Sequence, residues 1–133
     1  MSGGRWNHPG TAIVYASATL ALAALEVFVH VSPFDAPLDL VAVWADIPDE
    51  VAITRLRPRD LPADWRRHPP PEPLAALGTQ WVRRRRTAVM AVPSAVIPQE
   101  LNYLLNPGHP EFRRVRIGRP APFHFDERLW KGR

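Results

Sequence analysis

The sequence has 133 residues, of which 46% are apolar and 23% charged, so it suits one globular domain and is too apolar to be disordered. It contains no cysteine, which excludes a disulfide scaffold, a thiol nucleophile and a cysteine-based zinc site. The formal net charge of +4 is uneven: residues 1–50 hold one basic and six acidic side chains, and residues 51–133 hold sixteen and seven, which favours anionic partners such as nucleotides, nucleic acid or acidic proteins.

The first part of the chain predicts a loop, a strand and an apolar helix. Glycines and prolines mark residues 3–10 as a loop, and the β-forming residues 11–16 predict a strand. Ser17 is the predicted N-cap of a helix over residues 18–30. Because this helix is apolar nearly all round, we expect it to be buried, and we expect Pro33 to end it.

The same apolar segment does not predict a membrane span. Glu26 and His30 lie within residues 12–31, and a charged side chain is costly in the bilayer core. Arg5 alone does not make the basic region of a signal peptide. We therefore expect a cytoplasmic protein with no membrane partner.

Short elements separated by prolines are predicted for the rest of the chain. Six of the 16 prolines fall in residues 58–73, which we expect to form a surface excursion. The other expected elements are strands over residues 38–47, 87–92, 115–117 and 122–125, a helix over residues 73–85, a tight loop over residues 106–110, and a segment at 101–105 that suits either a strand or a turn. Two helices among short strands predict an α+β fold.

Glu26 is the most informative single residue. Its neighbours from Ala21 to Val29 are otherwise all apolar, and burying an unpaired carboxylate costs several kcal/mol. Either Glu26 forms a structural ion pair, with Arg5 or another arginine, or it is a catalytic carboxylate at the end of a cleft. The residues alone leave both readings open.

Three further residues are candidates for binding. Arg5 lies in a glycine-rich loop, where its guanidinium suits a phosphate, although a surface arginine is the simpler reading. Tyr15 suits either a core position or stacking on a ligand ring. Ser94 follows a predicted strand, where a turn-stabilising hydroxyl is the default, and no His/Asp partner at a telling spacing marks it as a nucleophile.

Two other motifs carry less information. His30 follows Glu26 at i+4, but such a pair is common by chance, and no set of ligands predicts a metal site. The run Arg83–Arg86 suits a solvated helix end, and nucleic-acid binding is the minority reading because no aromatic residues are interleaved with it.

The ordered motifs of the chain resemble those of the RES-domain family. The resemblance runs through GGRWNHPGTAIVYASATLALAALEVFVH, LVAVWADIPDE, LGTQWV, AVMAVPSAVIPQELNYLLNP, HPEF and FHFDERL. The family is named for an arginine, a glutamate and a serine, which correspond to Arg5, Glu26 and Ser94, and its active-site tyrosine corresponds to Tyr15. The resemblance covers nearly the whole chain in the family's order.

The resemblance implies a toxin of a bacterial type II toxin–antitoxin pair, with an ADP-ribosyltransferase-like fold of the diphtheria-toxin type. Such a toxin degrades NAD+, as a substrate rather than a cofactor, by cleaving the nicotinamide–ribose bond through hydrolysis or phosphorolysis. Glu26 would stabilise the ribosyl cation, Arg5 would hold the diphosphate or ribose, Tyr15 would stack on the nicotinamide, and Ser94 would position Arg5 or the ribose. The alternatives are ADP-ribosylation of a protein target and a non-catalytic RES domain that only binds its antitoxin.

The resemblance also implies a partner and a boundary. The expected partner is an Xre-like antitoxin with a helix-turn-helix domain, so that DNA would be bound only through the antitoxin. Family members carry further residues before GGRWN, whereas here two residues precede it. We therefore expect a single RES domain over residues 1–133 without the family's N-terminal segment.

Overall fold

The computed structural model describes residues 2–32, 34 and 37–131. Its main sheet has four strands in the order β1-β6-β5-β4, in which β4 and β5 are parallel and the other pairs are antiparallel. The strands are β1 (Val14–Ser17), β4 (Ile53–Arg55), β5 (Val89–Pro93) and β6 (Leu101–Leu105). The open choice at residues 101–105 is thus settled as a strand, and β4 was not predicted.

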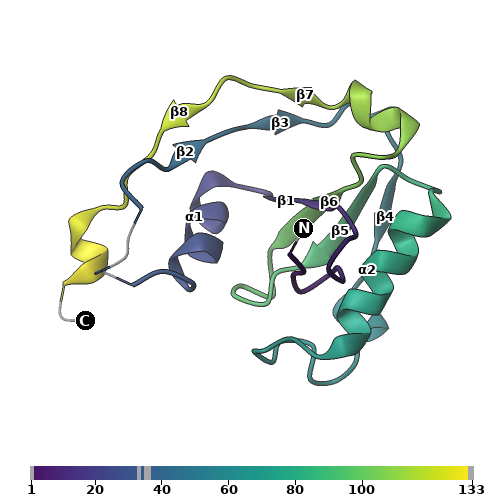
Figure 1. Cartoon of the computed structure of the whole chain (residues 1–133), viewed down its shortest axis with the longest axis horizontal. Coiled ribbons are helices and arrows are strands. Elements are labelled where there is room, and N and C mark those ends of the chain that lie inside the picture. The colour runs from purple at the N-terminus through teal and green to yellow at the C-terminus, as the bar shows by residue number, and fades with distance from the viewer. Residues whose placement is uncertain (1, 33, 35–36, 132–133) are drawn as a thin grey trace.

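Two short ribbons form an arm beside this sheet (Figure 1). The expected single strand over residues 38–47 is wrong, because it is divided into two strands with different partners. The ring of Trp44 at the break packs over Gly118, where a Cβ would lie 2.0 Å from the ring. The ribbons are β2 (Val41–Ala42) with β8 (Ala121–Pro122), and β3 (Ala45–Asp46) with β7 (Arg116–Ile117).

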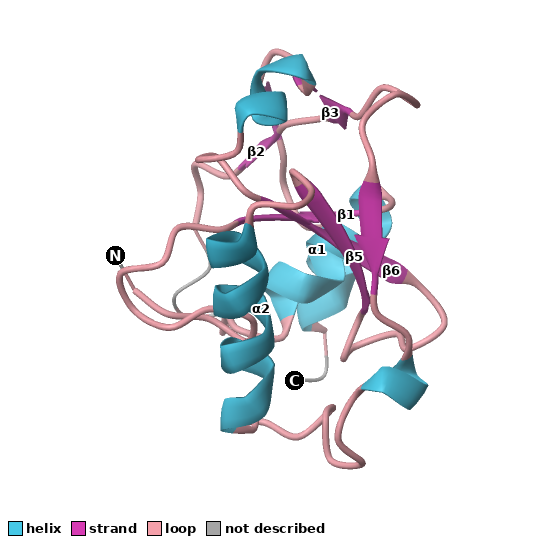
Figure 2. Cartoon of the chain, turned by 90° about the vertical axis from the view of Figure 1, so that its right-hand side faces the viewer, coloured by secondary structure: helices cyan, strands magenta, loops and turns pink. Residues whose placement is uncertain are grey.

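Helix α2 (Glu72–Arg84) covers one face of the main sheet (Figure 2), close to the predicted bounds. Its first turn carries Glu72 and its last turn carries two arginines, charges that favour the helix dipole. The helix ends at Arg84. The following residue, Arg85, caps it in the left-handed conformation with φ 55° and donates a hydrogen bond to the carbonyl of Gly108 at 3.2 Å.

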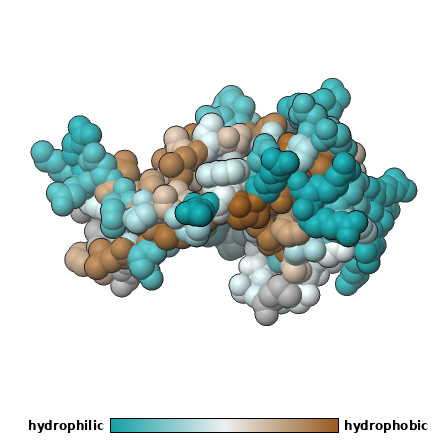
Figure 3. Space-filling view, turned by 90° about the horizontal axis from the view of Figure 1, so that it is seen from above, coloured by the Kyte–Doolittle hydropathy of each residue, from teal (hydrophilic) through white to brown (hydrophobic). Residues whose placement is uncertain are grey.

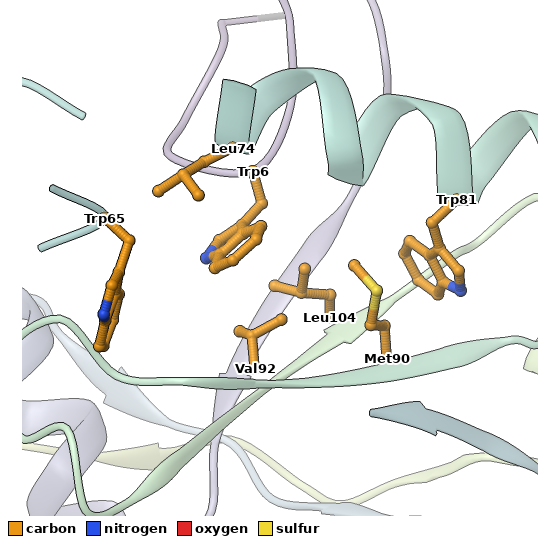
Figure 4. Close-up of a cluster of buried hydrophobic side chains, with 7 residues drawn as sticks. All are labelled: Trp6, Trp65, Leu74, Trp81, Met90, Val92 and Leu104. Carbon is orange, nitrogen blue, oxygen red and sulfur yellow. The ribbon is translucent and has the colours of Figure 1, made fainter. Parts of the chain in front are cut away.

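The main core lies between α2 and the sheet (Figure 4). The expectation that residues 58–73 only cross the surface is wrong in one respect, because Trp65 is buried in this core. A smaller cluster covers the other sheet face and includes Val89 and Leu105. The main core consists of Trp6, Trp65, Leu74, Trp81, Met90, Val92 and Leu104.

Helix α1 (Leu20–Phe28) is much less well covered than its sequence predicts. Within it only Leu22 and Phe28 are buried, so the expectation of a buried helix is wrong. Figure 1 shows α1 apart from α2, beneath the arm, and Phe28 packs on Phe125 and Trp130 near the end of the described chain. Residues from the C-terminal segment therefore shield one end of α1, and much of its surface is left open.

The start of α1 also differs from the prediction. Thr19 caps the helix through a bond from the Leu22 amide to its hydroxyl at 3.1 Å, whereas Ser17 ends β1. The helix ends at Phe28, and Pro33 lies outside the described residues. In the part of the chain that the structure describes, no helix is long and apolar enough to cross a membrane.

Candidate active site

The loop that carries Arg5 is held tightly against α2. A Cβ on Gly78 would lie 1.6 Å from the carbonyl oxygen of Trp6, so only glycine allows the helix and the loop to approach this closely. The neighbouring His8 bonds to both Glu72 and Thr79 on α2, at 2.6 and 3.0 Å. Close packing and hydrogen bonds to α2 therefore hold the loop that carries Arg5 in a fixed position.

The guanidinium of Arg5 is itself fixed by backbone oxygens. Its Nη1 donates to the carbonyls of Trp65 at 2.8 Å and Arg67 at 3.2 Å. Burial lowers the pKa of Arg5, whereas the nearby charges of Glu26 and Tyr15 raise it. Arg5 thus lies within electrostatic reach of Glu26 and keeps donors other than Nη1 for a ligand.

Tyr15 anchors its hydroxyl in the same loop and leaves its ring accessible. The hydroxyl accepts a bond from the Trp6 amide at 3.2 Å and donates to the side-chain oxygen of Asn7. Gly4 makes room for it, since a Cβ there would lie 2.8 Å from the hydroxyl. Burial raises the pKa of Tyr15, yet the residue as a whole remains 46% exposed.

Glu26 is bound by neutral donors. Its Oε2 accepts a hydrogen bond from the hydroxyl of Ser94 at 2.7 Å and another from Nδ2 of Asn102 at 2.5 Å. Among the described residues, no arginine lies within ion-pair distance of this carboxylate. Of the two readings open from the sequence, the structural ion pair is therefore not what the geometry shows.

Ser94 is fully buried and supports Glu26 rather than Arg5. Its hydroxyl accepts bonds from the amides of Val96 and Ile97, at 3.1 and 3.0 Å, while it donates to Glu26. The hydroxyl oxygen therefore already has two donors and its proton is committed, which leaves it poorly placed to act as a nucleophile. It stabilises the turn after β5 and directs the carboxylate.

Asn102 and Ser17 are the site residues that the sequence did not predict as such. Ser17 is the Cα partner of Asn102 across β1 and β6, and its hydroxyl donates to Oδ1 of Asn102 at 2.7 Å. Only the register of the two strands brings these side chains together. Asn102 lies in the LNYLLN segment, but nothing local in the sequence indicates that Ser17 is its partner.

A large apolar groove lies next to this cluster. Its volume is about 710 Å³, and it runs between the arm and the sides of α1 and β1. Seen from the side of the arm, the molecule has apolar surface between two hydrophilic ends (Figure 3). Ala16, Tyr103 and Leu105 line it, and strand alternation puts them on the face opposite Asn102. The groove shares Tyr15 and Ser17 with the polar cluster, but Arg5, Glu26 and Ser94 do not line it.

Among the described residues, the other sequence candidates have no part in the hydrogen bonds of Glu26. The ring of His30 lies 5.7 Å from that of His68, and the described residues hold no group of three potential metal ligands. In the Arg83–Arg86 run, Arg85 closes the end of α2. The site thus combines a fixed carboxylate, an anchored guanidinium and an accessible aromatic ring.

Comparison with known proteins identifies a family and several relatives of this chain. The RES domain profile matches residues 1–126. A protein of Sphingobium sp. named "Prs ADP-ribosylating toxin" is 37% identical over 97% of this chain and 81% of its own length. Proteins named "Toxin Res" from Yersinia enterocolitica and Photorhabdus laumondii are 37% and 33% identical, over 96% and 98% of this chain and 84% of each relative. Because the domain match spans nearly the whole sequence, the chain belongs to the RES-domain family.

Proposed function

We propose that this chain is an enzyme that cleaves the nicotinamide–ribose bond of NAD+. The observation that carries the proposal is the position of Glu26, whose carboxylate is fixed by two neutral donors and lies within electrostatic reach of Arg5. A carboxylate held by neutral groups keeps its full negative charge available to a ligand. This is the charge that a ribosyl cation requires.

The bond to be cleaved joins C1′ of the ribose to the nicotinamide nitrogen. As it breaks, the bonding electrons move to the ring nitrogen, so nicotinamide leaves as a neutral molecule and C1′ gains oxocarbenium character. The negative charge of Glu26 stabilises this cation and orients the ribose hydroxyls. A neutral leaving group needs no strong general acid, which agrees with a site whose described residues form no Ser/His/Asp set.

Arg5 and Tyr15 are assigned to substrate binding. Arg5 is anchored through Nη1 and offers its other N–H groups to the diphosphate or ribose of NAD+. Tyr15 offers an exposed ring for stacking on nicotinamide, while its hydroxyl is fixed in the loop. Ser94 acts through Glu26, since it is buried beneath the carboxylate.

The acceptor of the ADP-ribosyl group distinguishes the candidate activities. Water would give hydrolysis and phosphate would give phosphorolysis, both of which degrade NAD+. The name of the Sphingobium relative favours a second candidate, the transfer of ADP-ribose to a protein. All three activities share the same bond cleavage at Glu26.

We further propose that the chain acts as a toxin in the cytoplasm and is neutralised by a helix-turn-helix antitoxin. The names of the relatives support the toxin role. The fold is assigned to the ADP-ribosyltransferase type, which is supported by a divided set of small sheets around a helix. DNA would then be bound only through the antitoxin.

The test is a product analysis of NAD+ incubated with the purified chain. Three parallel samples contain buffer alone, added phosphate, or purified Prs, the protein in the name of the Sphingobium relative. Each sample is repeated with the Glu26→Gln variant. Free ADP-ribose indicates hydrolysis, ADP-ribose 1″-phosphate indicates phosphorolysis, and a mass increase on Prs indicates protein modification. Intact NAD+ in all three samples contradicts the proposal and favours a domain that only binds its antitoxin.

A further inference from the structure

The position of Glu26 depends on a side chain to which no role has been assigned. Asn102 lies on β6 between two neighbours, with Ser17 opposite on β1 and Val92 opposite on β5. Its Nδ2 donates to Glu26 and its Oδ1 accepts from the hydroxyl of Ser17. The amide group of Asn102 therefore joins β6 to two elements that are distant from it in sequence, β1 and α1.

The Ser17 bond determines which end of the amide faces the carboxylate. While the hydroxyl of Ser17 donates to Oδ1, the amide directs Nδ2 towards Glu26. A flipped amide would place its oxygen against a carboxylate oxygen, and two acceptors at this distance repel each other. Ser17 and Glu26 thus favour the same orientation of Asn102.

Glu26 needs this support because its helix is weakly held. Most large side chains of α1 are exposed, and Leu20 and Val27 are 56% and 39% accessible. Ser94, which directly follows β5, and Asn102 on β6 both donate a hydrogen bond to Oε2 of Glu26. A single bond would leave the carboxylate free to rotate, whereas two donors from different directions fix its plane and leave Oε1 for a ligand.

We infer that Asn102, oriented by Ser17, is a positioning residue that presents Oε1 of Glu26 to the ribose of the substrate. This inference rests on the proposed function. Asn102 does not itself touch the reacting atoms in this account. It acts by holding the carboxylate in the geometry that the cleavage requires, and displacement of a catalytic group by about 1 Å can lower a rate by about 10²-fold.

The main test replaces Asn102 by aspartate, which has nearly the same shape. Asn102→Asp removes the donor and places a second negative charge against Glu26. We expect kcat for nicotinamide release to fall by about 10²-fold with a much smaller change in KM. We also expect the acid limb of the pH–kcat profile to move to higher pH, because two adjacent carboxylates resist ionising together.

Asn106 provides a matched control at the end of the same strand. It is buried, donates to the carbonyl of Val82 at 3.3 Å and accepts from the Gly108 amide, all away from Glu26. Asn106→Asp therefore disturbs packing to a similar or greater degree without adding charge beside Glu26. We expect it to lower thermal stability and to leave the acid limb of the profile in place.

Two variants of Ser17 test whether its hydroxyl orients the amide of Asn102 or whether its side chain only fills space. Ser17→Ala removes the bond to Oδ1 and leaves the amide of Asn102 free to turn, so kcat should fall by about tenfold. Ser17→Thr keeps a hydroxyl at this position and should restore most of the rate. Equal rates in the alanine and threonine variants would contradict the orienting role of Ser17.

A spectroscopic measurement tests the contact without relying on activity. In ¹⁵N-labelled protein, the side-chain amide signals of Asn102, identified by their loss in Asn102→Asp, should move in Glu26→Gln, because the acceptor of Nδ2 has changed. The side-chain amide signals of Asn106 should stay in place. Asn102 signals that are unchanged in Glu26→Gln would overturn the inference.

The outcomes for the inference and for the proposed function are distinguishable. If the wild type releases nicotinamide but Asn102→Asp and Asn106→Asp behave alike, the inference is overturned and the proposed function stands. If the wild type leaves NAD+ intact, the proposed function fails, and with it a positioning role in that reaction. A rate loss and profile shift confined to Asn102→Asp support the inference.

Discussion

The two helices of this protein show how differently apolar sequence can be used. Helix α2 has a mixed sequence, yet Leu74 and Trp81 on its inner face are buried against the sheet. Helix α1 is almost entirely apolar, yet much of it is exposed. The first is held by packing along its inner face, whereas the second depends on the burial of Leu22 and Phe28 and on the hydrogen bonds of Glu26.

The site combines these two regions. Arg5, Ser94 and Asn102 belong to the well-packed body, and Glu26 is contributed by α1. A carboxylate on a weakly packed helix can adjust to a substrate, but it needs bonds to the body to be in place at all. The comparison therefore predicts that packing variants affect α2 most and that polar variants affect the position of α1 most.

The largest stability difference should separate two leucine variants. Leu74 is 0% exposed beneath α2, so Leu74→Ala should destabilise the protein by about 2–5 kcal/mol. Leu20 is 56% exposed on α1, so Leu20→Ala should change stability by no more than about 0.5 kcal/mol. Urea unfolding of both variants measures the difference, and similar losses would contradict the contrast between the helices.

A second variant tests the junction of α2 with the Arg5 loop. Helix propensity alone would make Gly78→Ala stabilising by about 1 kcal/mol. The added Cβ would meet the Trp6 carbonyl, so we expect a net loss of about 1–3 kcal/mol together with lower NAD+ affinity. Gly108→Ala is the control, because its nearest neighbour would lie 3.4 Å away. Stabilisation by Gly78→Ala would show that the loop is not held there.

The smallest expected effect concerns the pH dependence of stability. Burial raises the pKa of Tyr15 in the folded state, so the unfolded chain, whose tyrosine pKa is about 10, loses its proton first as pH rises. The contribution of Tyr15 is thus complete below about pH 10 and is lost above it. Thermal unfolding of the wild type should weaken more steeply between pH 9 and about pH 11 than that of Tyr15→Phe; parallel curves would contradict this.

Local patterns in the sequence predicted the elements whose residues carry a strong local signal. Helix α2 and strand β5 follow directly from periodicity and flanking residues. Strand β4 was missed because three partly polar residues become a strand only by pairing with β5. The exposure of α1 was also unpredictable, since apolar composition does not say whether other elements are available to cover a helix.

The same distinction applies to the site. A lone carboxylate in an apolar helix marked Glu26, and the resemblance to the RES family marked Arg5, Tyr15 and Ser94. The bond of Ser94 to Glu26 and the role of Asn102 depend on which residues face each other across strands. Long-range register of this kind leaves no local signal in a single sequence.

The most direct test of the account is the rate of nicotinamide release from NAD+ by the wild type and by Glu26→Gln. Both proteins are first compared by thermal unfolding, so that a folding defect is recognised. The account predicts release by the wild type and a rate at least about 10²-fold lower in the variant. Equal rates, or no release by a folded wild type, would contradict the assignment of Glu26 as the carboxylate that stabilises the ribosyl cation.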